Sequence, residues 1–214
     1  MAAAVAGVRG LTGEAPAAPL PELRTGRLDV RLARPGMEAA IARFLVENFP
    51  GHLDRWSPPV EPAFFTEAFW AQRLAIAVEE FRAGRAARFV LQPRGSADGP
   101  VIGTCNYTNI VRGPFQACQL GYQIARSHEG RGLMSEALRA ANAFAFAGLR
   151  VHRIMASYRP ENVRSARVLE RLGFVREGLA RDYLFIDGAW RDHVLTALTH
   201  PDFDPAWVEP AGRG

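Results

Sequence analysis

Apolar residues recur along this chain with two different periods, which predict alternating strands and helices. Leu28, Val30 and Leu32 alternate with charged residues within 27–33, which is typical of a half-buried strand. Strands are also predicted at residues 88–92, 101–111, 120–124 and 153–158, and two more between residues 178 and 199. Four other segments have helical spacing instead, with inward-facing residues Ala40, Ile41, Phe44 and Leu45; Phe69, Trp70, Leu74 and Ala77; Leu138, Ala141, Ala145 and Leu149; and Val168, Leu169 and Leu172.

Turn and capping residues set the limits of several elements. Asn162 is placed to cap the last helix, and Gly173 followed by Phe174 is typical of a Schellman stop. Asp187-Gly188 predicts a tight hairpin between the last two strands. The resulting order is one strand, two helices, three strands, a helix, a strand, a helix and two strands. This order predicts an α+β fold in which a single mixed sheet carries helices on both faces.

A proline-rich segment separates the first two predicted helices. Residues 51–65 contain Pro58, Pro59 and Pro62 and carry the aromatic residues Trp56, Phe64 and Phe65. Loops that carry exposed aromatic side chains often close over ligands, but such side chains also fill cores. Both interpretations of this segment stay open.

The chain is expected to hold one globular domain, at residues 24–203, because 48% of its 214 residues are hydrophobic. Residues 1–23, rich in Ala and Pro, are expected to be a flexible extension, and residues 204–214 a C-terminal tail. The start lacks the pattern of a signal peptide. No apolar run approaches the roughly 18 residues of a membrane span, so we expect a soluble, cytoplasmic protein.

Charge and cysteine content exclude several functions. The chain has 26 basic and 22 acidic residues, and every basic one is Arg, so a lysine nucleophile is excluded. The arginines are spread without a block, so direct nucleic-acid binding is not expected. Cys105 and Cys118 are too few for a disulfide framework or a zinc site, and their apolar neighbours predict buried thiols. No metal is expected.

The stretch LGYQIARSHEGRGLMSEAL, residues 120–138, predicts a strand, a glycine-rich arm and the start of a helix. Such a helix start offers unpaired backbone N–H groups and a positive dipole end, which together suit a pyrophosphate. Gly130 and Gly132 let the backbone approach a ligand closely, and Arg131 adds positive charge. An ordinary turn is the alternative. Ser165, in the first turn of the next helix, either completes local capping or binds the same ligand.

Residues in both of these helix starts resemble the GNAT superfamily of acetyl-CoA-dependent N-acetyltransferases. The likeness is greatest to its RimJ type, the ribosomal-protein-alanine N-acetyltransferases, and covers roughly residues 28–205. The stretches that carry it are 103–115 (GTCNYTNIVRGPF), 121–122, 129–134 (EGRGLM), 152–156 (HRIMA), Asn162 with Arg164 and Ser165, 171–174, and 182–198 (DYLFIDGAWRDHVLTAL).

The resemblance implies a GNAT fold in which a splayed strand pair and the arm bind acetyl-CoA. The residues implied to contact this cosubstrate are Ile124, Ala125, Glu129, Gly130, Arg131, Gly132, Leu133, Met134, Ser135, Asn162 and Ser165. Two of them depart from the superfamily pattern. Met134 replaces Gly or Ala, as it also tends to in the RimJ type. Glu129 replaces Gln or Arg, and because a carboxylate beside a pyrophosphate is unfavourable, its contact with the coenzyme stays open.

The resemblance also implies the chemistry. A thioester is already activated, so an amine can attack it directly without an acetyl-enzyme. Ser165 is implied to protonate the departing thiolate, and Asp182 to take a proton from the ammonium through a water. Asp182 could instead only pair with an arginine, and His193 is a lesser candidate base. Asn106 and Tyr122 either line the acceptor groove or serve only strand packing.

The function implied is acetylation of the α-amine of a protein N-terminus, with alanine of a ribosomal protein as the expected acceptor. One alternative is a small-molecule, antibiotic or toxin amine, because related folds serve many acceptors. A second, of another class, is a non-catalytic ribosome-assembly or CoA-binding factor. The sequence leaves both monomer and dimer open.

Overall fold

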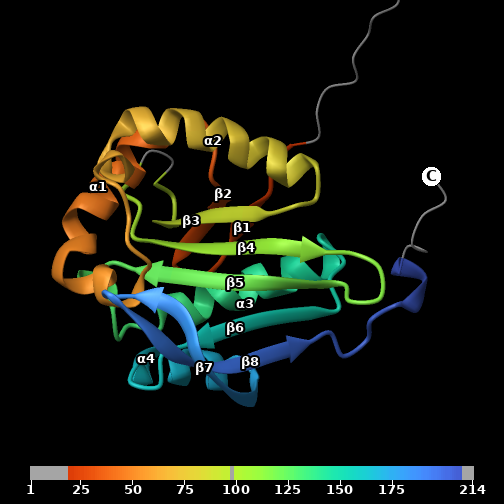
Figure 1. The fold of residues 1–214 in the computed structure, drawn as a ribbon. Coiled ribbons are helices and arrows are strands. Elements are labelled where there is room, and N and C mark those ends of the chain that lie inside the picture. The colour runs from red at the N-terminus through yellow and green to blue at the C-terminus, as the bar shows by residue number, and fades with distance from the viewer. Residues whose placement is uncertain (1–18, 97–98, 209–214) are drawn as a thin grey trace, which may run out of the picture.

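The fold is built on one mixed sheet. The computed structural model describes residues 19–96 and 99–208. Eight strands lie in the order β1 (Glu22–Arg24), β2 (Leu28–Leu32), β3 (Ala87–Pro93), β4 (Gly103–Val111), β5 (Ala117–Ile124), β6 (Arg153–Tyr158), β8 (Ala189–Thr199) and β7 (Val175–Ile186) (Figure 1). Neighbours are antiparallel except β5 and β6, which are parallel.

Helices cover both faces of this sheet, as the sequence predicts. They are α1 (Glu38–Asn48), α2 (Glu67–Arg82), α3 (Leu133–Ala147) and α4 (Val163–Arg171). Successive residues of a strand face opposite sides. In β3, Phe89 and Leu91 accordingly join the core beneath α3 and α4, whereas Val90 joins the core beneath α1 and α2. No helix within residues 19–96 and 99–208 is long and apolar enough to cross a membrane.

Short helical turns fill the proline-rich segment between α1 and α2. They are η1 (Phe49–Leu53), η2 (Asp54–Trp56) and η3 (Pro62–Phe65). The rings of Phe64 and Phe65 lie 6.1 and 5.4 Å from that of Phe49, in edge-to-face contact. Such pairs add to the stability of a core. This end of the segment therefore fills the core, which is one of the two interpretations left open above.

The folded part of the chain extends beyond both limits of the expected domain, residues 24 and 203. β1 begins at Glu22, inside the expected extension of residues 1–23, because Leu23 pairs with Val30 and packs on the core. Residues 1–18 lie outside the described part. At the other end, η5 (Pro205–Trp207) lies inside the expected tail, and the Trp207 carbonyl accepts a 3.0 Å hydrogen bond from Gln116. These residues of the expected tail are therefore in contact with the folded domain.

The last helix begins and ends as predicted. The side chain of Asn162 accepts a 3.1 Å hydrogen bond from the Ser165 amide, which caps α4. At the other end, the amides of Phe174 and Gly173 bond to the carbonyls of Leu169 and Glu170, and Gly173 has a φ of +84°. This is the Schellman pattern.

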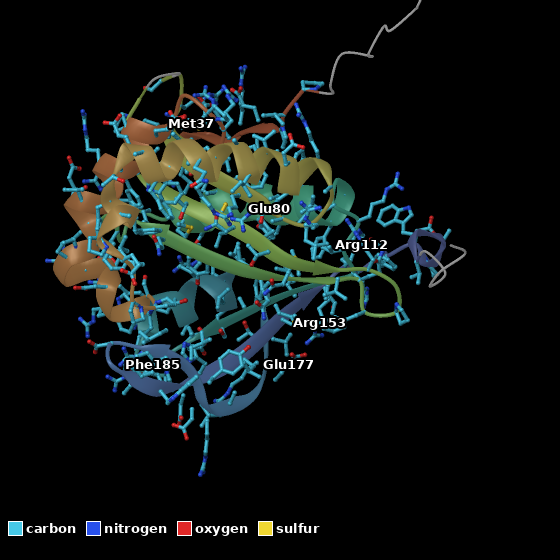
Figure 2. The ribbon with its side chains drawn as sticks, turned by 45° about the horizontal axis from the view of Figure 1, so that its top comes forward. Met37, Glu80, Arg112, Arg153, Glu177 and Phe185 are labelled. Carbon is cyan, nitrogen blue, oxygen red and sulfur yellow. The ribbon has the colours of Figure 1, made fainter. Side chains whose placement is uncertain are left out.

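The β7–β8 hairpin turns at the predicted dipeptide. Asp187 and Gly188 have φ values of +51° and +70°, as a type I′ turn requires. The pairing of the two strands is interrupted between Ala180 and Leu184, where β7 bulges. Figure 2 shows Phe185, just beyond this bulge, on the hairpin at the edge of the sheet. A bulge bends a strand, and Figure 1 shows the tip of the hairpin curving toward α1.

The two thiols are buried, as predicted. Cys105 and Cys118 are free and inaccessible, within the core beneath α3. Burial raises the pKa of both thiols to about 12. Because the thiolate is the nucleophilic form, neither residue suits covalent catalysis.

Candidate active site

The arm between β5 and α3 has the backbone shape that an anion site needs. It runs through η4 (Arg126–His128) to Gly130 and Gly132, whose φ values are +73° and +74°. Side chains with a Cβ rarely adopt this conformation. The first intrahelical bond of α3 is donated by Glu136 to Gly132. The amides of residues 133–135 precede that bond, so α3 does not use them itself.

Three further observations fit a diphosphate at this place. A Cβ built on Gly130 would meet nothing within 4 Å, so the space beside the arm is open. Ser135 is only 5% exposed, yet its hydroxyl has no hydrogen-bond partner among the described residues. The side chains of Leu133 and Met134 are buried in the core, so these residues present only backbone to a ligand. That explains how Met134 can replace a small residue.

Beside the arm, the parallel strands β5 and β6 separate. Their pairing covers only Ala117 with Arg153, Cys118 with Ile154 and Gln119 with Met155, although β5 continues to Ile124. The predicted splayed strand pair is therefore confirmed. A gap of this kind exposes main-chain groups of both strands to an extended ligand such as pantetheine. The Ile124 carbonyl and the Ala125 amide are already paired, with His52 and Ile102 respectively.

Two hydroxyl groups meet beside this gap, one from the part of β5 that β6 does not pair and one from the first turn of α4. The Tyr122 hydroxyl lies 2.7 Å from Ser165 Oγ, and either oxygen can be the donor. The Ser165 hydroxyl is not used in capping, because Asn162 caps α4. Burial raises the pKa of Tyr122, and the hydrogen bond with Ser165 only partly offsets this. Tyr122 is therefore a neutral phenol that can donate a proton or a hydrogen bond to Ser165.

Glu129 is paired with positive charge. Its Oε2 lies 2.5 Å from Arg164 Nη1 in the first turn of α4, and its Oε1 lies 4.0 Å from His52 Nε2. The arginine compensates the carboxylate that replaces the superfamily's Gln or Arg. The ion pair also connects the arm to α4.

Sequence reasoning did not single out the residues that fix the end of β5 from the α1 side. Asn48 Oδ1 accepts a 3.0 Å bond from the Arg126 amide, and His52 Nε2 lies 3.1 Å from the Ile124 carbonyl. Both are buried, at 8% and 7% exposure. These contacts join positions 78 and 72 residues apart, so no local pattern could have indicated them.

A cleft of about 290 Å³ lies between the proline-rich segment and the hairpin tip. It is lined by Phe49, Asp54, Arg55, Ser57, Pro58, Pro59, Asp187 and Gly188. Ser57 Oγ accepts a 3.3 Å hydrogen bond from Gln123 of β5, so the cleft borders the end of that strand. The Trp56 ring lies 5.4 Å from the Arg159 guanidinium, just before α4.

Asp182 lies in the bulge of β7 with a φ of +48°. Its side chain is exposed, and its amide donates a 2.9 Å hydrogen bond to Asp192. Within residues 19–96 and 99–208, it forms no ion pair, so the arginine pairing considered above is not observed. No hydrogen bond or ion pair joins it to Ser165 or Tyr122 in this part of the chain either.

The other two candidates of the sequence analysis lie in regular strand positions. His193 is 3% exposed, and its Nδ1 lies 3.0 Å from the Arg191 carbonyl. Asn106 lies opposite Gly121 in the pairing of β4 with β5 and is half-buried. In the described part of the chain, neither residue forms a hydrogen bond with Tyr122 or Ser165.

A splayed parallel strand pair, a glycine arm suited to a diphosphate and a hydroxyl pair beside the gap are the features expected of a coenzyme-A-dependent acyltransferase. The chain belongs to the acetyltransferase (GNAT) domain family, whose sequence profile matches residues 32–175.

Among its relatives is the [ribosomal protein uS5]-alanine N-acetyltransferase of Escherichia coli (strain K12). The two are 44% identical over 187 residues, which cover 87% of this chain and 95% of that protein. A solved ribosomal-protein-S5-alanine acetyltransferase from Vibrio fischeri is 38% identical, with a TM-score of 0.82 over 86% of this chain and 100% of that one. Mycobacterium smegmatis RimJ in complex with CoA-disulfide is 32% identical, with a TM-score of 0.76 over 86% and 90%. The family resemblance predicted from sequence is confirmed.

Proposed function

We propose that this chain transfers an acetyl group from acetyl-CoA to the α-amine of the N-terminal alanine of ribosomal protein uS5. The observation that carries the acceptor assignment is the 44% identity to a uS5-alanine N-acetyltransferase across 95% of that protein. The cleft beside the end of β5 is open to solvent, as a protein N-terminus requires. A ribosomal protein as acceptor supports a cytoplasmic location for the enzyme.

The arm and the strand gap supply binding and orientation. The amides of residues 130–135 and the unpartnered Ser135 hydroxyl would hold the diphosphate, and the edges of β5 and β6 would hold the pantetheine. Acetyl-CoA supplies an acetyl group already activated as a thioester. Fixing two reactants in place can account for most of the rate enhancement, because it removes the entropic cost of their encounter.

Ser165 and Asp182 would carry the protons. Ser165 Oγ donates a proton to the departing sulfur, while the neutral Tyr122 hydroxyl donates a hydrogen bond to that oxygen. The Asp182 carboxylate takes a proton from the incoming ammonium through a water, since its side chain is exposed and forms no ion pair within the described residues. Asp182→Asn should then lower kcat by about 100-fold without weakening CoA binding. An unchanged kcat would assign Asp182 a structural role only.

Mass spectrometry of acetylated products tests the acceptor. The purified enzyme and acetyl-CoA are incubated with the N-terminal peptide of uS5, the same peptide with its α-amine blocked, and a panel of small-molecule amines. We expect one acetyl group on the free peptide and none on the blocked peptide. Acetylation of small amines with none on the peptide would replace this proposal with the small-molecule alternative.

A further inference from the structure

Arg27, in the turn between β1 and β2, crosses to the coenzyme arm. Its Nη1 donates a 2.9 Å hydrogen bond to the Arg131 carbonyl, in the middle of the arm. Its Nε and Nη2 lie 2.7 and 2.6 Å from Oε2 of Glu136, in the first turn of α3. Its backbone amide donates a fourth bond, of 2.8 Å, to Glu136 Oε1. One side chain therefore holds both the arm and the helix that follows.

The bond to the Arg131 carbonyl fixes the direction of an amide. The Arg131 C=O and the Gly132 N–H belong to one peptide unit, and in a trans peptide these groups point in opposite directions. No described peptide bond is cis. With its carbonyl held by Arg27, the Gly132 N–H must face away from the guanidinium. Gly130 and Gly132 allow many backbone conformations, so the Arg131–Gly132 peptide could otherwise rotate. The hydrogen bond from Arg27 limits this rotation.

The same arginine balances a carboxylate near the anion site. Glu136 lies within one turn of the helix start, where an uncompensated negative charge would oppose a diphosphate. The Arg27 side chain donates to this carboxylate through Nε and Nη2, and Thr25 Oγ1 donates a further 2.7 Å hydrogen bond to it. Burial raises the pKa of Glu136, but the bonds from Thr25 and Arg27 outweigh this and lower it. The carboxylate therefore stays ionised and paired at neutral pH.

We propose that Arg27 is a positioning residue for coenzyme binding: it orients the Arg131–Gly132 peptide so that the Gly132 amide faces the diphosphate, and it neutralises Glu136 beside that site. This rests on the use of coenzyme A in the proposed function. Arg27 lies outside residues 32–175, the part matched by the family profile. Its contacts span 104 and 109 positions, so only the fold brings it to the arm.

The test is calorimetric titration of the full chain with CoA, for wild type, Arg27→Ala and Arg27→Lys. We expect both variants to bind CoA about tenfold more weakly or worse, because a lysine keeps the charge but lacks the planar fork. Arg24→Ala is the matched control, since within the described residues the Arg24 side chain pairs with Glu22 of its own strand, β1, and not with the arm, so this variant should bind like wild type.

A second readout separates positioning from general damage. S-acetylpantetheine carries the thioester but lacks the diphosphate. Arg27→Ala should raise the KM for acetyl-CoA and leave kcat/KM for S-acetylpantetheine unchanged. Equal losses with both donors, or wild-type CoA affinity in Arg27→Lys, would overturn the proposal. If Arg27→Ala does not fold, the lysine variant alone decides. The titration uses no acceptor, so an error in the acceptor assignment would not alter its result.

Discussion

The Ser165 hydroxyl is available to a ligand because a neighbouring residue caps the helix in its place. Asn162 caps the helix, and the remaining contact of Ser165 Oγ is the Tyr122 hydroxyl at 2.7 Å. The sequence placed Ser165 in the first turn of a helix but left capping and ligand binding equally open. Only the position of Tyr122, 43 residues earlier, favours ligand binding. That choice could not be made from sequence, since it depends on how β5 and α4 pack.

Ser165→Ala should lower kcat by about 100-fold with little change in the KM for acetyl-CoA, because a proton donor acts only as the thiolate leaves. Tyr122→Phe should lower kcat less, and adding it to Ser165→Ala should cost nothing more. Steady-state kinetics of the two single variants and the double variant measure this. Additive losses would show that the two hydroxyl groups act independently.

The pH dependence should not involve ionisation of Tyr122. Burial raises the pKa of this phenol, so the neutral form is favoured and persists up to and beyond its ordinary pKa of about 10. Tyr122→Phe should therefore reduce kcat/KM by the same factor at every pH between about 6 and 9. The measurement is a pH–rate profile of both proteins. Loss of a basic limb in the variant would contradict the assignment.

At the scale of elements, local pattern predicted the arm, and distant contacts complete it. The alternation in β5, the two glycines and the helical spacing of α3 are local features, so the strand, arm and helix were all foreseen. Several contacts that hold the arm come from Asn48, His52 and Arg27, which lie more than 70 positions away. Hydrophobic periodicity carries no information on such pairs. The bulge in β7 was missed for the same reason, since it depends on pairing with β8.

Two glycines with the same φ angle provide a matched test of the arm. Gly130 and Gly113 both have a φ of +73°, and a Cβ on either would meet nothing within 4 Å. Alanine at either position should lower the free energy of unfolding by roughly 1–2 kcal/mol. Only Gly130→Ala should also weaken CoA binding, by about tenfold or more, since its Cβ enters the ligand space.

Thermal unfolding and calorimetric titration of the two variants measure these effects. Equal CoA affinity in Gly130→Ala and Gly113→Ala would place the diphosphate elsewhere.

At the scale of the molecule, the proposed coenzyme site lies where one mixed sheet opens between two helical layers. α1 and its following turns hold the end of β5 from one side, and α3 and α4 begin on the other (Figure 1). Element order predicted both layers, because consecutive elements pack predictably. The ordered β1 and η5 were not foreseen, since their apolar residues are few and contact distant parts of the chain.

The central claim is that the whole molecule acetylates uS5, and the most direct measurement is the intact mass of uS5. Cells that lack their own uS5 acetyltransferase would express this chain, with an empty vector as the control, and uS5 would be purified from their ribosomes. The account predicts one added acetyl group, located by fragmentation on the N-terminal alanine, and none in the control. Unmodified uS5 in cells that contain folded, CoA-binding enzyme would contradict it.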